Sequence, residues 1–434
     1  MLFLDIQDPD FTTRFDAILS RSEESGREVE QVVLDIIADV RLRGDAAVLE
    51  LTRRFDRLEA ASVTELEVGE HEFATAFSQV SEADIAALKL AVERVSRFHE
   101  KQKQQTWLST EEPDIMLGQK VTPLARVGIY VPGGKASYPS SVIMNAVPAR
   151  VAGVGEIIMV APTPGGEINP HVLVAAKLSG VDRVFRIGGA QAVAALAYGT
   201  GTIPKVDKIT GPGNIYVATA KKLVFGQVGI DMIAGPSEIL VISDGSGIPA
   251  HIAADLLSQA EHDELASSIL ITTDRAFADK VATEVERQLA KLSRETIARA
   301  SWEKYGAIII AGSLDEAITF SNRIAPEHLE LAVTDPFAIL PQITNAGAIF
   351  MGHWTPEAAG DYLAGPNHTL PTGGTARFFS PLSVDDFVKK SSIVYFSKGG
   401  LKRLGSDIVR IAGLEGLEAH GKSVSLRLED RDIS

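Results

Sequence analysis

Short apolar runs rich in β-branched residues recur through the middle of the chain, and glycine or proline stops most of them. In one example, Arg183-Val184-Phe185-Arg186-Ile187 ends in Gly188-Gly189 and leads into an alanine-rich segment from Ala190 to Ala197. Similar runs occupy residues 126–131, 156–161, 208–210, 239–243, 268–272 and 307–310. Buried strands that alternate with helices indicate α/β units with parallel sheets.

We therefore predict an α/β fold with two Rossmann-like domains, each built on a parallel sheet. Residues 16–54 and 82–105 carry apolar side chains at helix spacing, so we expect helices there. The last fifty or so residues depart from the strand–helix order and are too few to bury their own core, so we expect them to pack elsewhere. The expected divisions are an N-terminal arm (1–24), a first α/β domain (25–129 and 236–381), a second α/β domain (130–235) and a small helical C-terminal domain (382–434).

The composition excludes several classes of protein. A formal net charge of −15 argues against nucleic acid or an anionic membrane surface as the main partner. No segment approaches the roughly 20 uncharged apolar residues needed to span a bilayer, and the acidic N-terminus lacks the features of a secretory signal. The chain has no cysteine, which rules out thiol nucleophiles and thiolate metal ligands. We expect a globular, cytoplasmic protein.

Glu327 and His328 stand side by side in an otherwise apolar segment, directly after Pro326. A carboxyl group and an imidazole are the commonest general acid–base groups near neutral pH. Pro326 suits the first turn of a helix, where a missing N–H costs nothing, so we expect the pair at a helix start. A solvated helix start without a catalytic role is the alternative that the pair by itself leaves open.

Glycine-rich loops follow three of the predicted strands. In open α/β sheets, ligands bind outside the carboxyl ends of the strands, and glycine lets backbone N–H groups approach a phosphate. None of the loops matches G-x-G-x-x-G, because Tyr216 occupies the third glycine position after Gly211 and Gly213. Each loop alone is equally compatible with an ordinary turn, but together they favour a cofactor site. The loops are Gly133-Gly134, Gly188-Gly189-Ala190-Gln191 and Gly211-Pro212-Gly213-Asn214.

A second group of polar residues points to a metal site. Asp255, Gln259 and His262 fall at positions i, i+4 and i+7, so they share one face of a helix that we expect over residues 249–266. A hydrated polar stripe is the alternative interpretation of this face. Nitrogen and oxygen donors suit zinc or a similar divalent metal. Such a site could combine Gln259 and His262 with Asp361 and His420.

His368 lies in the turn-rich segment Gly365-Pro366-Asn367-His368. Asn367 and His368 could contact a ligand, or the polar groups of the loop could satisfy its own backbone. The sequence leaves both interpretations open.

Taken together, the motifs resemble those of the histidinol dehydrogenase family, over residues 25 to 425. So many long motifs in one order make the resemblance specific, and no motif position departs from it. The motifs are Tyr130-Val131-Pro132-Gly133-Gly134, Gly188-Gly189-Ala190-Gln191, Gly211-Pro212-Gly213-Asn214, Ala234-Gly235-Pro236-Ser237-Glu238, Ser258-Gln259-Ala260-Glu261-His262-Asp263, Ala325-Pro326-Glu327-His328-Leu329-Glu330, Gly365-Pro366-Asn367-His368 and Glu415-Gly416-Leu417.

The resemblance implies an NAD-dependent oxidation of L-histidinol to L-histidine through the bound aldehyde, the last step of histidine biosynthesis. It implies that the acid–base pair is Glu327 and His328. One zinc ion per subunit would be bound by Gln259, His262, Asp361 and His420. The metal ligands and His328 would hold the substrate together with Ser237, His368 and Glu415. NAD would contact Tyr130, Gln191 and Asn214.

The resemblance also implies a homodimer in which the C-terminal piece reaches into the neighbouring subunit's site. Because the chain has no cysteine, the aldehyde must react with water, and Glu327 is the natural base to activate it. His328 would serve the two hydride-transfer steps. A non-enzymatic binding protein and a zinc hydrolase that works without NAD are the alternatives from other functional classes.

Overall fold

A computed structural model of the protein describes residues 1–19, 27–133, 138–233 and 235–429. Gly134 and Ala234, which belong to two of the motifs, lie outside the described residues. The chain divides into two compact units, residues 1–102 with 124–387 and residues 103–123 with 388–434. In the part of the chain that is described, no helix is both long and apolar enough to cross a membrane.

The first unit contains a five-stranded parallel sheet with the order β6-β5-β4-β7-β8. The chain enters at the central strand, adds β5 and β6 on one side, and then returns to add β7 and β8 on the other. The strand order therefore reverses between β4 and β7, which is where open parallel sheets bind ligands. The strands are β4 (Arg126–Tyr130), β5 (Glu156–Val160), β6 (Arg183–Phe185), β7 (Lys208–Thr210) and β8 (Gly229–Ile230).

Helices bury both faces of this sheet. Ile157 and Met159 of β5 belong to one apolar cluster, and Ile158 and Val160 belong to the other, as the alternation of side chains along a strand requires. The first cluster is completed by α4 (Glu70–Gln79), α5 (Glu82–Glu100), α6 (Pro139–Ala152) and α7 (Pro170–Leu178). The second is completed by α2 (Arg27–Arg43), α3 (Asp45–Asp56), α8 (Gly189–Tyr198) and α9 (Ile215–Val224).

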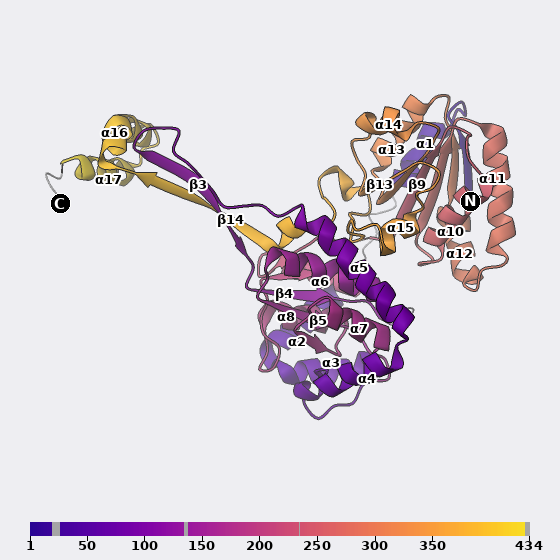
Figure 1. Cartoon of the computed structure of the whole chain (residues 1–434), viewed down its shortest axis with the longest axis horizontal. Coiled ribbons are helices and arrows are strands. Elements are labelled where there is room, and N and C mark those ends of the chain that lie inside the picture. The colour runs from indigo at the N-terminus through magenta and orange to yellow at the C-terminus, as the bar shows by residue number, and fades with distance from the viewer. Residues whose placement is uncertain (20–26, 134–137, 234, 430–434) are drawn as a thin grey trace. The chain divides into compact units, whose positions relative to one another are not determined.

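A six-stranded parallel sheet forms the rest of the first unit, with the order β1-β11-β10-β9-β12-β13 (Figure 1). Its strand order reverses between β9 and β12, as the order of the five-stranded sheet does between β4 and β7. The first residues of the chain pair with β11 and form an edge strand of this sheet. The strands are β1 (Leu2–Asp5), β9 (Glu238–Ser243), β10 (Ser267–Thr272), β11 (Ala307–Ile310), β12 (His328–Ala332) and β13 (Ala348–Met351).

Helices also cover both faces of the six-stranded sheet (Figure 1). One apolar cluster joins the sheet to α10 (Pro249–Ala260), α11 (Arg275–Leu289) and α12 (Glu295–Tyr305). The other joins it to α1 (Phe11–Leu19), α13 (Leu314–Ile324) and α14 (Pro336–Ile339). The shorter elements are α15 (Glu357–Tyr362) and the 3₁₀ turns η2 (Val63–Leu66), η3 (Leu340–Gln342), η4 (Thr375–Arg377) and η5 (Val384–Phe387).

Residues 27–100 pack on the five-stranded sheet, although the sequence analysis grouped them with residues 236–381. Val33 of α2 joins the apolar cluster of Ile158, and Val95 of α5 joins the cluster of Ile157. The spacing of apolar residues identifies the buried face of a helix but does not say which sheet that face meets. The expected N-terminal arm likewise contains a strand and a helix, β1 and α1, that belong to the six-stranded sheet and its core.

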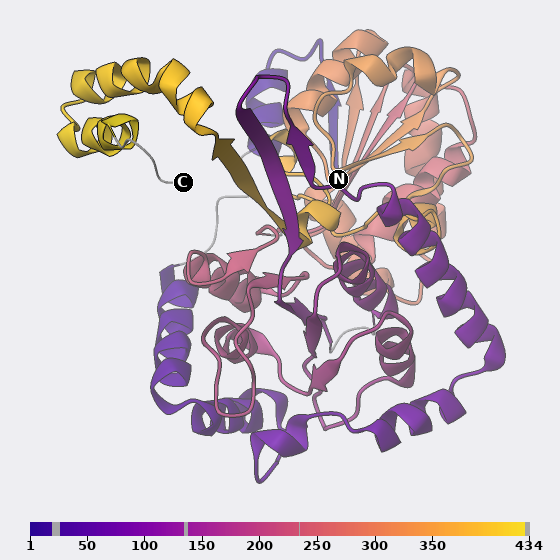
Figure 2. The same ribbon diagram turned by 60° about the vertical axis from the view of Figure 1, so that its left-hand side comes forward.

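The second unit contains strands as well as the expected C-terminal helices. A three-stranded antiparallel sheet has the order β14-β3-β2, and β14 with β3 forms the long ribbon that Figure 2 shows leading to the last two helices. Leu428 and Val424 of α17 approach Gly405 of α16, so the two helices pack closely. The elements are β2 (Trp107–Ser109), β3 (Ile115–Pro123), β14 (Val388–Phe396), α16 (Lys398–Leu414) and α17 (Glu418–Glu429).

We predict that the first helix is an integral part of the six-stranded domain. Phe15 of α1 is fully buried and lies against Phe11 and Phe320, with ring centroids 5.6 and 5.0 Å away. Phe15→Ala should lower the free energy of unfolding by about 3–5 kcal/mol, because a buried aromatic ring is lost and a cavity remains. Urea titration at fixed protein concentration measures the loss. Phe337→Ala, at a ring that is 73% exposed, is the matched control, and equal losses would contradict the prediction.

Candidate active site

Glu327 and His328 lie at the start of a buried strand, so the predicted helix start is wrong. Ala325 has φ 54° and forms the left-handed C-cap of α13, after which Pro326 and Glu327 lead into β12. A left-handed cap followed by proline is typical of a helix end. Along β12, Leu329 and Leu331 point into the apolar cluster that contains α13, and His328 and Glu330 point to the opposite face.

His328 is almost completely buried and is held in one orientation. Its Nδ1 lies 3.0 Å from the carbonyl oxygen of Glu238, at the start of β9. A carbonyl only accepts hydrogen bonds, so this contact places the proton on Nδ1 and leaves Nε2 as the acceptor nitrogen. Nε2 has no hydrogen-bond partner among the described residues, and Asp361 Oδ1 lies 3.9 Å from it. The imidazole is therefore arranged to accept a proton at Nε2.

Burial sets the protonation of the pair. It lowers the pKa of His328 to about 4, against the opposing effects of Asp361 and the Glu238 carbonyl. The imidazole is therefore neutral near pH 7. Burial also raises the pKa of Glu327 well above its usual value, although the N–H of Glu238 donates to Glu327 Oε2 over 2.9 Å. A carboxyl group whose pKa is raised is a stronger base when it is ionised.

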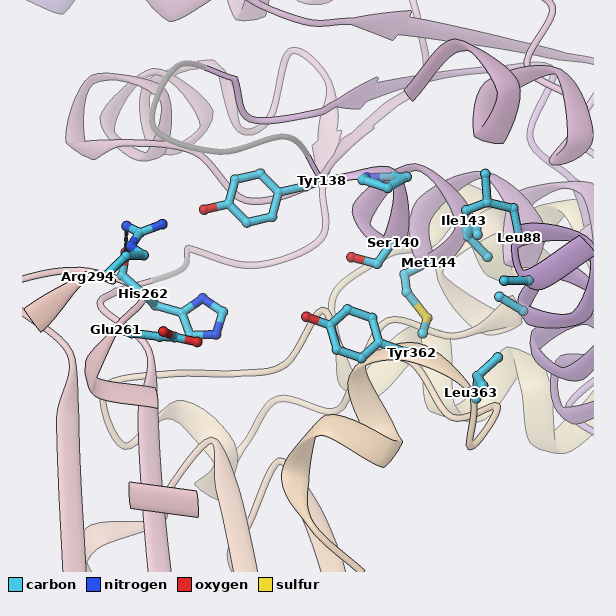
Figure 3. A pocket seen from close by; sticks show the side chains of 13 residues that line it. Leu88, Tyr138, Ser140, Ile143, Met144, Glu261, His262, Arg294, Tyr362 and Leu363 are labelled. Atoms are coloured by element: carbon cyan, nitrogen blue, oxygen red, sulfur yellow. Dashed lines mark hydrogen bonds between the residues drawn. The ribbon is translucent and has the colours of Figure 1, made fainter. Parts of the chain in front are cut away.

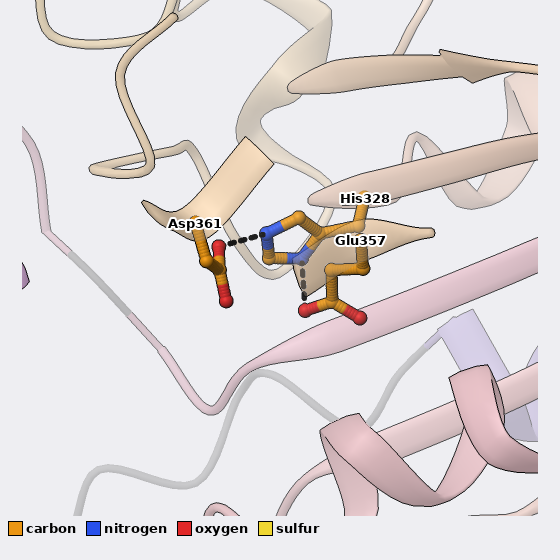
Figure 4. Close-up of side chains that lie close together, drawn as sticks. All are labelled: His328, Glu357 and Asp361. Carbon is orange, nitrogen blue, oxygen red and sulfur yellow. Dashed lines mark ion pairs between the residues drawn. The ribbon is translucent and has the colours of Figure 1, made fainter. Parts of the chain in front are cut away.

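Glu357 and Asp361 bring two further carboxyl groups to His328 (Figure 4). They lie four residues apart on α15, and Glu357 Oε1 is 3.5 Å from His328 Nδ1. One ligand atom from each of the three residues lies within 4.8 Å of the others, so the group could hold a metal ion. Burial raises the pKa of Glu357 well above its usual value. The sequence analysis missed Glu357, although its spacing from Asp361 places both on one helix face.

The helix that carries Gln259 is shorter than expected. It ends at Ala260 rather than near residue 266, so His262 lies beyond the helix. Gln259 is buried in the last turn, with its Nε2 3.5 Å from His328 Nδ1. One turn earlier, Asp255 accepts a hydrogen bond from the carboxyl group of Glu330. Burial raises the pKa of Asp255 to about 6 and that of Glu330 well above its usual value.

His262 and His368 complete the group in the first unit. A positive charge on either would lower the pKa of His328, and a charge on His262 would lower that of His368, so the three imidazoles lie near one another. The negative charge of Asp361 opposes this effect at both His328 and His368. The fold thus brings together Glu327, His328, Gln259, His262, Asp361 and His368, which are distant in sequence.

These residues lie at the amino ends of β9 and β12. Ser237 immediately precedes β9 and is half-buried at the same edge. This position differs from the rule for open sheets, which places ligands at the carboxyl ends. Glu415 and His420 lie in the second unit, where both side chains are exposed. That they join the metal and substrate sites stays a prediction.

A cavity of about 510 Å³ opens beside His262. Figure 3 shows His262 and Glu261 at one end of it, with Tyr362 and Tyr138 along its course. The remaining wall is largely apolar and is formed by Leu88, Ala91, Ile143, Met144 and Leu363. A pocket with one polar and one apolar end suits a small amphipathic molecule.

The residues predicted to contact NAD lie at the carboxyl edge of the five-stranded sheet. Tyr130 ends β4, and its hydroxyl accepts a hydrogen bond from the N–H of Gly189 over 3.1 Å. Asn214 is the N-cap of α9, and its Oδ1 accepts from two backbone N–H groups of the first turn. Gln191 of α8 is 1% exposed, yet neither atom of its amide has a partner among the described residues. Unsatisfied buried amide atoms at a sheet edge of this kind indicate a place for a polar ligand.

Comparison with known proteins identifies the family that this arrangement resembles. A family model described as histidinol dehydrogenase matches residues 19–428. Histidinol dehydrogenase of Geobacter sulfurreducens is 83% identical over 429 residues, covering 99% of this chain and 100% of the relative. That of Pseudomonas aeruginosa is 58% identical over 427 residues, with 98% and 97% covered. A crystal structure of histidinol dehydrogenase from Elizabethkingia anophelis matches with a TM-score of 0.93 and 37% identity, covering 99% of this chain and 98% of that one.

We predict that the neutral state of His328 is visible in the pH dependence of stability. The pKa of His328 is about 4 in the folded chain, and its ordinary value is 6.5. Below about pH 6.5, the unfolded chain therefore binds a proton at this residue that the folded chain does not bind. The stability of the wild type should therefore fall relative to His328→Asn, by about 2 kcal/mol between about pH 7 and pH 5. Urea titrations of chelator-treated protein measure the difference.

His171→Asn is the control for this experiment, because the His171 side chain is 43% exposed. Its stability relative to the wild type should change little over the same pH range. If the difference between the wild type and His328→Asn were also constant, His328 would be solvated in the folded protein.

Proposed function

This chain belongs to the histidinol dehydrogenase family, and we propose that it oxidises L-histidinol to L-histidine through L-histidinaldehyde, with the reduction of two NAD molecules. The observation that carries the proposal is the buried pair of Glu327 and His328, where one imidazole nitrogen is an unpartnered acceptor. Membership of the family makes the chain an oxidoreductase of histidine biosynthesis. The cofactors and the roles of single residues are the parts that we infer.

We assign the proton transfers of both oxidations to His328. Its Nε2 would accept the hydroxyl proton of the alcohol as hydride leaves the adjacent carbon for NAD, the cofactor that accepts hydride when bound. The hydrogen bond from Nδ1 to the Glu238 carbonyl stabilises the imidazolium that forms. Asp361, 3.9 Å from Nε2, adds a compensating negative charge. The same nitrogen would accept the proton of the aldehyde hydrate in the second oxidation.

We assign the activation of water to Glu327. Oxidation of the aldehyde needs an oxygen nucleophile, and the chain has no cysteine to form a thiohemiacetal. Glu327 is 6% exposed, and its Oε2 is 3.7 Å from His328 Nδ1, so the proposed base lies beside the imidazole that would accept the proton. The raised pKa of Glu327 matches a general base that must both take and return a proton near neutral pH.

We propose that Gln259, His262 and Asp361 of the first unit bind one zinc ion together with His420. Gln259 lies 3.5 Å from the His328 imidazole, and the charges of His262 and Asp361 both act on it. This supports the set, since zinc accepts nitrogen and oxygen ligands. Bound zinc would orient the substrate by coordinating its nitrogen atoms. Glu357 is an additional donor at the same place. Ser237, His368 and Glu415 would complete the substrate site.

We propose that NAD binds at the carboxyl edge of the five-stranded sheet through Tyr130, Gln191 and Asn214. The unpartnered amide of Gln191 supports this placement, because a cofactor could satisfy it. Burial raises the pKa of Tyr130 to about 12, so its hydroxyl stays protonated and can still donate a hydrogen bond. In the loop that joins β7 to α9, Gly213 would offer its backbone N–H to a pyrophosphate.

We also propose a homodimer in which the second unit of one subunit completes the active site of the other. The second unit exposes large apolar side chains, among them Leu414 at 83% and Val394 at 66%. Exposed apolar surface of this kind marks a contact with another protein surface. The polar residues Glu415 and His420 lie in the same unit, within six residues of Leu414 in the sequence.

Paired substitutions should separate the roles of Glu327 and His328. Glu327→Gln should slow aldehyde oxidation about 10²–10⁴-fold while sparing alcohol oxidation, because only the aldehyde step needs activated water. His328→Asn should slow both steps by a comparable factor, since each releases a proton. Stopped-flow measurement of NADH formation from histidinol and from histidinaldehyde resolves the steps.

Glu330→Gln is the matched control for that pair. Glu330 is a buried glutamate two residues along the same strand, bonded to Asp255 and not to the reacting groups. Its variant should lower neither step by more than a few-fold. An equal loss of both steps in Glu327→Gln would contradict the water-activation role.

The reaction as a whole is tested by its stoichiometry. We expect two molecules of NADH for each molecule of L-histidinol consumed, measured by absorbance with limiting substrate. A chelator should abolish the activity, and added zinc should restore it, because the proposed ligands orient the substrate only through the metal. A yield of one NADH per histidinol would contradict the oxidation to the acid. Calorimetry that detected no NAD binding would favour a hydrolase on the same scaffold.

A further inference from the structure

Lys221 and Asp231 form a buried ion pair that the proposed chemistry does not use. Their side chains are 2% and 1% exposed. Lys221 lies in α9, and Asp231 directly follows β8. The two residues are ten apart in the sequence and meet beneath the loop that joins β7 to α9.

The pair binds both polar groups of one backbone residue, Gly211. The N–H of Gly211 donates to Asp231 Oδ2 over 2.8 Å, and the Gly211 carbonyl oxygen accepts from Lys221 Nζ over 2.8 Å. Asp231 is itself held by its backbone N–H, which donates to the carbonyl of Ile209 in β7. The loop from β7 to α9 therefore starts at Gly211, whose backbone N–H and carbonyl oxygen are both held by charged side chains.

Gly211 has a backbone conformation and a close contact that only glycine accommodates. Its φ is +110°, in the region that favours glycine, and a Cβ atom there would lie 2.1 Å from the carbonyl oxygen of Tyr130. Gly211 thus lies directly against the last residue of β4, where the strand order of the sheet reverses. Three residues later, Asn214 begins α9.

The energetics of the pair favour a positional role over a general contribution to stability. Two charges that leave water lose much solvation energy, and neutral residues of similar volume often replace a buried ion pair without loss of stability. Lys221 is also buried and neutralised by Asp231, so it is not placed to contact a phosphate itself. What the pair supplies is directional contact with the backbone of Gly211.

We propose that Lys221 and Asp231 are positioning residues for the cofactor, which hold Gly211 so that the loop to Asn214 and the end of β4 keep their binding shape before NAD arrives. The inference rests on the proposed binding of NAD at this edge of the sheet. The pair would therefore increase the affinity for NAD and would take no part in the chemical steps.

The test is a double variant, Lys221→Met with Asp231→Asn, which removes both charges and keeps an acceptor for the N–H of Gly211. The dissociation constant for NAD, measured by calorimetry, should rise about tenfold, because the freed loop residue must be ordered again on binding. The KM for NAD should rise in parallel. The kcat and the KM for histidinol should stay within about twofold of the wild type, because the acid–base site is at the other sheet.

A matched control exists on β7, the strand that leads to Gly211. Lys208, at the amino end of β7, bonds Asp386 over 2.8 Å, and their side chains are 15% and 26% exposed. Lys208→Met with Asp386→Asn therefore removes a less buried lysine–aspartate pair at the opposite edge of the sheet. This control should leave NAD affinity unchanged. A folded Lys221/Asp231 variant with unchanged NAD affinity, or an equal effect in the control, would overturn the inference. A wild type that bound no NAD would overturn the proposed function, and this inference with it.

Hydrogen exchange on the wild type covers the case in which the double variant does not fold. In protein free of NAD, the amide of Gly211 should exchange at least about a hundredfold more slowly than an unstructured peptide, because Asp231 holds it. Exchange at the unstructured rate would show that the loop is not held in advance, and would overturn the inference.

Discussion

The pairing of β9 with β12 at the centre of the six-stranded sheet is the interaction on which the active site depends. In this parallel register, His328 lies opposite Ile239, so the backbone of Glu238 comes next to both acid–base residues. Its N–H donates to Glu327 Oε2 and its carbonyl oxygen accepts from His328 Nδ1. One peptide unit on each side of Glu238 thus orients the carboxyl group and the imidazole together. A shift of this register would separate them.

Burial then gives the oriented groups their chemical character. Around His328 the fold gathers three glutamates, Glu327, Glu330 and Glu357, each with a pKa that burial raises well above the usual value. Burial therefore disfavours the ionised form of each of these carboxyl groups. The buried Lys221–Asp231 pair solves the same problem in the other sheet by mutual neutralisation. In both sheets, these buried charged groups direct a neighbouring backbone or side chain.

Seven strands of the two parallel sheets, β4 to β7 and β9 to β11, could be predicted from the sequence, because each buried run carries its own signal. The remaining strands, β1, β8, β12 and β13, were not predicted. The limits of the prediction have equally local causes. The segment Ala325-Pro326 is compatible with the start or the end of a helix, and only the left-handed backbone of Ala325 decides for the end. Helix α10 stops at Ala260, six residues earlier than the expected end at residue 266. The apolar spacing of residues 16–54 and 82–105 predicts helices but not which sheet those helices cover.

The sequence by itself determined the α/β class, the residue types available for chemistry and the absence of a thiol nucleophile, since these follow from composition and local pattern. The tertiary structure decided which residues meet. It brought Glu357 to His328, paired Asp255 with Glu330, and placed the acid–base pair at the amino ends of its strands. It also buried Lys221 against Asp231. The reason is that contacts between residues far apart in the chain depend on strand order and register, which no local spacing encodes.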